Sequence, residues 1–147
     1  MPSSAAHEDV LERYLRPFHG RWTKRFPDEY YQELYRLKGW TWPGPGAIHP
    51  PIVGDITNDL VYARMADDLL DQLRLKNPKN PDGERKCKHH QWLTDDFGVQ
   101  ELREHMVGVT AIMRTIQDPD PVRAWKKFLT RLDHACPRKR NRYRFER

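Results

Sequence analysis

Hydrophobic residues recur at helical spacing in several parts of the chain. The clearest stripe consists of Leu102, Met106, Val109, Met113 and Ile116, which are alternately four and three residues apart. This spacing places all five side chains on one face of a helix, as a buried stripe requires. The pattern predicts a helix of about four turns here.

The same criterion predicts helices in the first half of the chain. One covers residues 7–15. A second follows RFPDEYYQELYRLKG, where the proline and two acidic residues suit a helix start and Gly39 suits its end. A third begins at Thr57 or Asn58, both common N-cap residues, and continues to about Leu75.

The last predicted helix follows the sequence DPDP and ends at Cys136, before a proline. Its predicted buried residues are Val122, Trp125, Phe128, Leu129 and Leu132. Residues 40–56 contain four prolines and three glycines, which predict a long loop with room for a short β-hairpin. Residues 77–84, NPKNPDGE, predict a turn-rich break.

These elements predict a mainly α fold of about five helices. A chain of 147 residues is within the usual range for a single domain. We expect one compact domain over residues 1–136, followed by a basic, flexible tail over residues 137–147. Because the chain has nothing long before its first helix, we expect either a stand-alone domain or a piece of a longer protein.

Charge is distributed unevenly along the chain. The formal net charge is +5, and residues 137–147 contain six basic residues and one acidic residue, which accounts for the whole excess. No apolar run approaches the ~20 residues that span a bilayer, and the N-terminus does not resemble a secretory signal. Two cysteines are too few for a disulfide scaffold. We therefore expect a protein of the reducing bacterial cytoplasm with no membrane partner.

A zinc site is one hypothesis for the cysteines and histidines. The spacings Cys87-x-His89 and His134-x-Cys136 offer four ligands of suitable type. Neither spacing matches the usual structural zinc patterns, and side chains two residues apart point to different sides of a helix. We therefore predict no metal and no cofactor.

The segment KCKHHQWLTDDFG (86–98) concentrates reactive side chains. A small hydrolase or nuclease would use His89 or His90 with a carboxylate from Asp55, Asp59 or Asp95. However, no nucleophile elbow, phosphate-binding loop or zinc-protease motif is present. The TDD sequence is typical of a helix N-cap followed by acidic residues, so catalysis is not the favoured interpretation.

Nucleic-acid binding is the favoured interpretation of the basic residues. Basic stretches occur at residues 13–25, 74–90 and 137–147, and Trp92 adds an aromatic plane. The predicted contact residues are Lys86, Lys88, His89, His90, Gln91, Arg138, Lys139, Arg140, Arg142 and Arg144. Thr57, Asn58 and Asp59, at the predicted start of the third helix, form either a cap or a polar pocket for an anion.

Four sequence motifs support a resemblance to a known family. The motifs RWTKRFPDEYYQELYRLKGW, GDITNDLVYARM, KHHQWLT and LREHMVGVTAIMR occur in this order. The chain resembles, over roughly residues 6–136, the phage and prophage domain family named after the C-terminal part of a myxophage protein. The resemblance implies a phage-derived module of the kind associated with antirepressors and other prophage regulators. It implies no particular activity.

Together these observations predict a regulatory or binding module of phage origin that associates with nucleic acid or with a nucleic-acid-bound protein. Two alternatives remain open at this point. One is the hydrolase or nuclease described above. The other is a domain that forms homo-oligomers or recruits a protein partner and binds no ligand.

Overall fold

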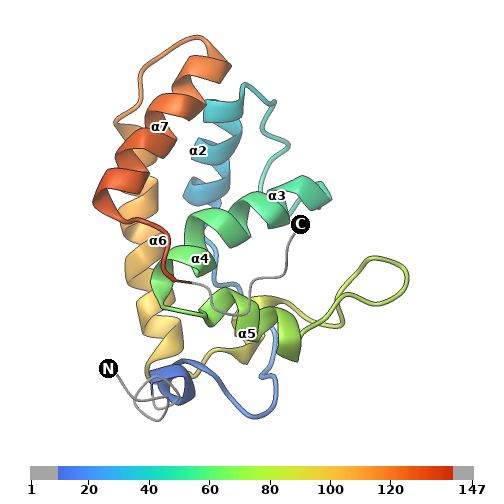
Figure 1. Ribbon diagram of the computed structural model, residues 1–147. Coiled ribbons are helices and arrows are strands. Elements are labelled where there is room, and N and C mark those ends of the chain that lie inside the picture. The colour runs from blue at the N-terminus through green and yellow to red at the C-terminus, as the bar shows by residue number, and fades with distance from the viewer. Residues whose placement is uncertain (1–9, 141–147) are drawn as a thin grey trace.

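The computed structural model describes residues 10–140, and this part of the chain is mainly helical (Figure 1). Residues 10–14 are helical. The elements that follow are α2 (Asp28–Lys38), α3 (Pro51–Thr57), the π-helical turn η1 (Asn58–Tyr62), α4 (Ala63–Met65), α5 (Leu69–Lys76), the 3₁₀ turn η2 (His89–Trp92), α6 (Gly98–Arg114) and α7 (Pro121–Ala135). The predicted mainly α fold class is confirmed.

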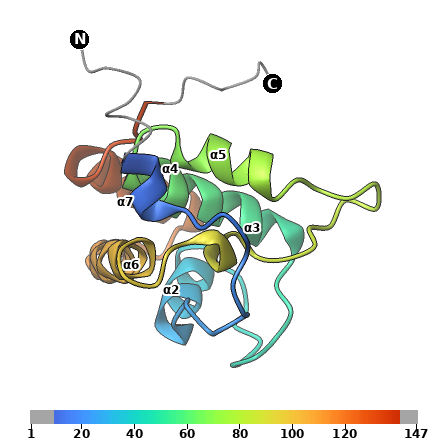
Figure 2. The same cartoon turned by 90° about the horizontal axis from the view of Figure 1, so that it is seen from below.

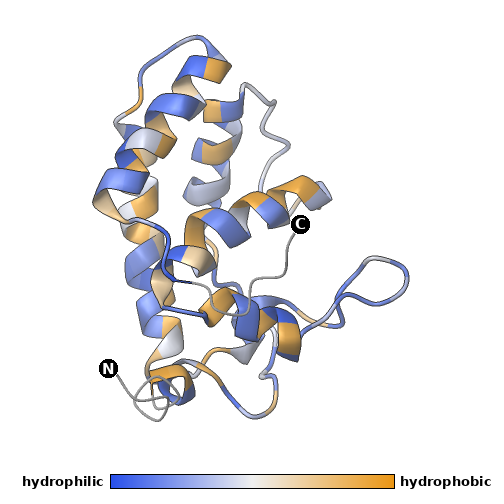
Figure 3. Cartoon of the chain, in the orientation of Figure 1, coloured by the Kyte–Doolittle hydropathy of each residue, from blue (hydrophilic) through white to orange (hydrophobic). Residues whose placement is uncertain are grey.

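The core lies where α2, α6 and α7 pack together and the α3–α4 segment crosses them (Figures 1 and 3). All five residues of the predicted stripe are buried: Leu102, Met106, Val109, Met113 and Ile116. Helix α7 contributes Ala124, Phe128 and Leu132 to the same core, and their four-residue spacing defines its buried face. Val122 lies off this face and is 78% exposed, so its predicted burial is wrong.

The predicted start of the third helix is also wrong. Helix α3 begins at Pro51, where a proline is well tolerated because the first helical residue needs no N–H hydrogen bond. Thr57 and Asn58 consequently lie inside a continuous α3–η1–α4 segment and do not start a helix. The segment ends at Ala66, which has extended backbone angles, and Asp68 has a positive φ of 61° before α5.

The loops differ from the sequence-based prediction in one respect. Within the described residues, the bridge of a short hairpin joins Lys79 to Arg85 and does not lie in the proline-rich loop. This hairpin extends away from the helices in both views (Figures 1 and 2). No helix of the described chain is long and apolar enough to cross a membrane.

The first residues of the predicted basic tail lie against the helices. The backbone N–H of Lys139 donates to the carbonyl of Ala63 at 2.8 Å, and the N–H of Asp68 donates to the carbonyl of Arg140 at 2.8 Å. The N–H of Arg140 also donates to a carboxylate oxygen of Asp67 at 2.9 Å. Residues 141–147, and with them Arg142 and Arg144, lie outside the described residues.

Candidate nucleic-acid interface

The η2 turn connects the N-terminal segment to the rest of the domain. The backbone N–H of Arg16 donates to the carbonyl of Trp92 at 2.8 Å, and that of Gly20 donates to the carbonyl of Gln91 at 2.6 Å. The Gln91 side chain donates back to the Gly20 carbonyl at 3.1 Å and accepts from the Lys88 backbone N–H at 2.8 Å. Gln91 therefore fixes the position of residues 16–20, which contain no helix or strand of their own (Figure 2).

Thr94 links the same N-terminal segment to α6. Its backbone N–H donates to the carbonyl of Tyr14 at 2.8 Å, and its hydroxyl donates to the carbonyl of Arg13. The hydroxyl oxygen also accepts from the N–H of Gly98 at 2.8 Å, where α6 begins. The prediction that Thr94 is the N-cap of this helix is wrong: Phe97 occupies the N-cap position of α6, without a side-chain cap, and Asp95 and Asp96 lie in the turn before it.

His89 and His90 lie in the interior, with exposed fractions of 7% and 9%. The His89 ring contacts the edge of Tyr62, and its Nδ1 lies 3.2 Å from the side-chain amide nitrogen of Asn77. Asn77 also donates to the Cys87 carbonyl at 2.8 Å, so it connects the end of α5 to the start of this segment. The His90 ring centroid lies 6.1 Å from that of Phe26.

Burial is the main cause of the low pKa values of both histidines. It lowers the pKa of His89 to about 3, and the nearby cations Arg85 and Arg74 contribute further. It lowers the pKa of His90 to about 4, with Arg25 and Lys88 adding to the effect. Both rings are therefore uncharged near neutral pH, and a direct surface contact by either ring with nucleic acid does not agree with their burial.

The residues of the hydrolase hypothesis do not form a connected site. Asp55 is exposed on α3, Asp59 pairs with two arginines, and Asp95 lies 3.9 Å from Arg25. Among the described residues, none of these carboxylates forms a hydrogen bond or ion pair with His89 or His90. A hollow of about 300 Å³ is lined by other residues: Glu12, Arg13, Thr94, Asp96 and Phe97.

The four candidate zinc ligands are likewise not brought together. The Cys87 thiol donates to the side-chain oxygen of Asn77 at 3.4 Å, whereas the Cys136 thiol lies 3.7 Å from Nδ1 of His105. His134 is exposed. Within residues 10–140, no group of three or more His, Cys, Asp or Glu side chains is arranged to hold a metal ion.

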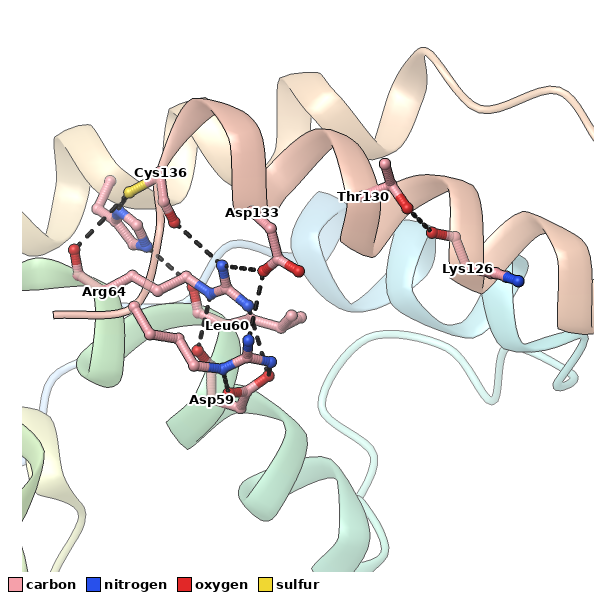
Figure 4. A network of polar contacts seen from close by, with 9 residues as sticks. Asp59, Leu60, Arg64, Lys126, Thr130, Asp133 and Cys136 are labelled. Carbon is pink, nitrogen blue, oxygen red and sulfur yellow. Dashed lines mark hydrogen bonds and ion pairs between the residues drawn. The ribbon is translucent and has the colours of Figure 1, made fainter. Parts of the chain in front are cut away.

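A buried arginine accounts for the polar residues around Asp59 (Figure 4). Arg64 is 1% exposed, and its guanidinium donates to Asp133 at 2.7 Å, to the Cys136 carbonyl at 3.0 Å and to the Asp59 carbonyl at 3.0 Å. Nη2 of Arg138 donates to the Asp59 carboxylate at 2.9 Å, so the same aspartate also joins the start of the tail to η1. We call Asp59, Arg64, Asp133 and Arg138 the Arg64 cluster.

The predicted anion pocket lies in the same region and has other partners. Thr57 is buried and its hydroxyl lies 3.0 Å from the hydroxyl of Tyr30. The Asp59 carboxylate pairs with Arg138 and lies 3.6 Å from Arg64. Because these residues lie inside a continuous helical segment, the free helix N-terminus on which the predicted pocket depended is not there.

Basic residues from three segments surround the η2 turn. We call residues 16–25, 74–76 and 85–88 the basic platform; together they contain nine Lys or Arg residues and no Asp or Glu. Two of the segments contact the Trp92 ring. Nζ of Lys76 lies 5.8 Å from the centroid of this ring, and the centroid of the His19 ring lies 5.7 Å from it. The three segments converge on the η2 turn: Gly20 and Lys88 are both hydrogen-bonded to Gln91, and Lys76 lies beside Trp92.

Only part of this charge is compensated nearby. Lys24 pairs with Asp28 at 3.0 Å, Arg25 lies 3.9 Å from Asp95, and Arg74 lies 3.7 Å from Asp71. The other six cations of the platform form no ion pair with another described residue: Arg16, Arg21, Lys76, Arg85, Lys86 and Lys88. The predicted contact residues Lys86 and Lys88 are exposed within it.

Sequence reasoning missed two exposed aromatic side chains in the platform. Phe18 is 78% exposed and Trp22 is 63% exposed. Both occur within a basic stretch that the sequence had indicated, so alternation of aromatic and basic residues was the available signal. Arg138, by contrast, is a predicted contact residue whose charge is already matched by Asp59 and Asp133.

Comparison with known proteins identifies one family. Residues 10–102 match the model of the P-63-C domain, a span that runs from the N-terminal helix into α6 and includes the η2 turn. No curated protein and no solved structure matches the chain.

Proposed function

The chain belongs to the phage-associated P-63-C domain family, and on this premise we propose that it is a regulatory binding module that associates with nucleic acid through the basic platform. The observation that carries the proposal is the convergence of three basic segments around one turn, through the contacts of Gly20, Lys76 and Lys88 with η2. Gathering like charges is unfavourable in an isolated protein, and a polyanion compensates it.

The side chains of the platform are suited to phosphate contacts. Arg21, Lys86 and Lys88 are exposed, and lysine and arginine supply most of the protein contacts to nucleic-acid phosphates. Gln91 has a different role from the predicted one, because its amide is bonded to Gly20 and Lys88. It positions the platform and does not contact the ligand.

Charge reversal tests this function. We expect an Arg21→Glu/Lys88→Glu variant to bind labelled oligonucleotides at least about tenfold more weakly at low salt. The logarithm of its binding constant should also fall less steeply with the logarithm of salt concentration, because each lost phosphate contact removes a released counterion. Fluorescence anisotropy at several salt concentrations measures both quantities.

The matched control reverses two exposed cations elsewhere. Arg103 on α6 and Lys126 on α7 are both exposed and outside the platform. An Arg103→Glu/Lys126→Glu variant has the same net charge as the platform variant, so it separates a local site from the effect of net charge. The proposal is wrong if both variants lose affinity equally, or if the unmodified chain binds no nucleic acid at low salt.

The same assay distinguishes the contribution of residues 138–140 to binding from that of residues 141–147. Removal of residues 141–147 leaves the described contacts of Lys139 and Arg140 with α4 and Asp67 in place. If the end of the chain adds to binding, as its charge predicts, affinity falls further in this shortened chain at low salt than at high salt.

A further inference from the structure

The exposed aromatic residues of the described chain are concentrated in the basic platform. Eight large hydrophobic residues of residues 10–140 are exposed; of the six aliphatic ones, Leu75 lies in the platform and the other five lie elsewhere. The two aromatic ones, Phe18 and Trp22, lie four residues apart in the platform. Single exposed apolar residues are normal, but a pair of exposed aromatic rings among uncompensated cations requires a separate explanation.

The segment that carries these rings is held in place at both ends and in its middle. Before Phe18, Leu15 forms a β-bridge with Leu93, and the N–H of Arg16 is bonded to Trp92. Between the two rings, Gly20 makes two hydrogen bonds with Gln91. After Trp22, Phe26 is buried in the core. The rings are thus outside the core although the backbone around them is fixed.

This arrangement has the two features of a surface that binds single strands. Uncompensated cations attract the phosphates, and exposed aromatic rings stack on bases whose faces are accessible. In a duplex the bases are stacked on one another, so only the phosphates and groove edges are presented to such a surface. Aromatic rings therefore add affinity for a single strand that they do not add for a duplex.

We propose that the basic platform binds single-stranded nucleic acid, with Phe18 and Trp22 stacking on unpaired bases and the surrounding lysines and arginines contacting the phosphates. This inference rests on the proposed function and makes it more specific. It assigns Phe18 and Trp22 as the residues that distinguish a single strand from a duplex.

The test compares three probes of one length, about 16 nucleotides: a mixed-sequence single strand, the corresponding duplex, and an abasic single strand that has phosphates but no bases. The variants are Phe18→Ala/Trp22→Ala and the conservative Trp22→Phe. We expect the double variant to bind the mixed-sequence strand about tenfold or more weakly. Its affinity for the duplex and for the abasic strand should change by less than about twofold. Trp22→Phe should keep most of the affinity.

The outcomes of this test distinguish failure of the stacking proposal from failure of the proposed function. If the chain binds single strand, duplex and abasic strand equally, and the double variant does not change this, stacking is wrong while polyanion binding stands. If the double variant loses affinity for all three probes alike, the rings support the platform and do not stack on bases. If no probe binds, both proposals fail. The same measurements with DNA and RNA strands of one sequence show which sugar the site accepts. Circular dichroism checks that the variants are folded.

Discussion

The Arg64 cluster and the basic platform are both rich in arginine, but they use it differently. In the Arg64 cluster, side chains join distant parts of the chain: Arg64 contacts Asp133, and Arg138 contacts Asp59. In the basic platform, the backbone makes the connections, through the hydrogen bonds of Arg16 and Gly20 with the η2 turn. Six of the platform's nine cationic side chains are exposed, where a ligand can reach them: Arg21, Lys24, Arg74, Lys76, Lys86 and Lys88.

This difference shows why a basic stretch in a sequence does not by itself identify a binding surface. The charge of Arg138 is used within the protein by two carboxylates. The charges of Arg21, Lys86 and Lys88 have no such partner among the described residues. What matters is whether carboxylates from other parts of the fold lie beside the cations, and only the tertiary structure shows this.

The largest expected effect is a loss of stability when the Arg64 cluster is disrupted. We expect Arg64→Met to lower the free energy of unfolding by about 2–4 kcal/mol, because the carbonyls of Cys136 and Asp59 lose their donor. Arg21→Met should change it by less than about 0.5 kcal/mol, because Arg21 is exposed. Urea unfolding followed by circular dichroism measures both. Similar losses in the two variants would remove the distinction between the two regions.

The second prediction concerns the buried histidines beneath the platform. Their pKa values, about 3 for His89 and about 4 for His90, lie below the ordinary value of about 6.5 expected in the unfolded chain. Between about pH 4 and about pH 6.5 the unfolded chain therefore binds more protons than the folded chain. The free energy of unfolding is highest above about pH 6.5 and decreases as the pH falls toward 4. From about pH 7 to about pH 4.5 we expect a loss on the order of a few kcal/mol.

Two variants identify the groups responsible for this loss. His89→Asn removes one of the two buried titrating rings, and we expect the dependence of unfolding free energy on pH to be clearly weaker than in the unmodified chain. His134→Gln removes an exposed ring and should leave the dependence unchanged. A pH dependence that is the same in all three proteins would show that His89 does not contribute to it.

The third prediction tests how the platform is held. Gln91→Ala removes the side-chain bonds to Gly20 and Lys88, and we expect a loss of about 1–2 kcal/mol in unfolding free energy. The affinity for single-stranded oligonucleotides should also fall, by less than in Phe18→Ala/Trp22→Ala, because the rings remain but are less well fixed. Gln117→Ala, which removes only a long 3.5 Å bond on the surface, is the control. An unchanged affinity in Gln91→Ala would show that the backbone bonds alone fix the segment.

The sequence predicted the elements whose signal is local. Helix α6 follows from its apolar spacing, and Gly39 ends α2 in the left-handed conformation that its position predicted. The start of α3 was missed because Pro51 is typical both of a loop and of the first residue of a helix.

The burial of the polar residues at the candidate site could not be predicted, because it depends on contacts with residues distant in the sequence. The burial of His89 and His90 follows from a 3₁₀ turn packed against Tyr62 and Phe26, far away in the sequence. The burial of Arg64 likewise depends on Asp133, 69 residues further along the chain. A spacing rule shows which residues of one helix share a face, but it gives no partner for a polar residue. Sequence patterns therefore located the basic residues and misplaced the histidines.

The smallest expected effect concerns Arg138, a predicted contact residue that belongs to the Arg64 cluster. Arg138 is half exposed and pairs with Asp59 and Asp133, so we expect Arg138→Gln to lower the unfolding free energy by only about 0.5–1 kcal/mol. Because its charge is already matched, the variant should keep its affinity for single-stranded oligonucleotides within about twofold at moderate salt. Arg21→Gln removes the same charge from the platform and should weaken binding severalfold without loss of stability. If instead Arg138→Gln weakens binding as much as Arg21→Gln, the Asp59 pair opens when nucleic acid binds, and the two regions belong to one surface.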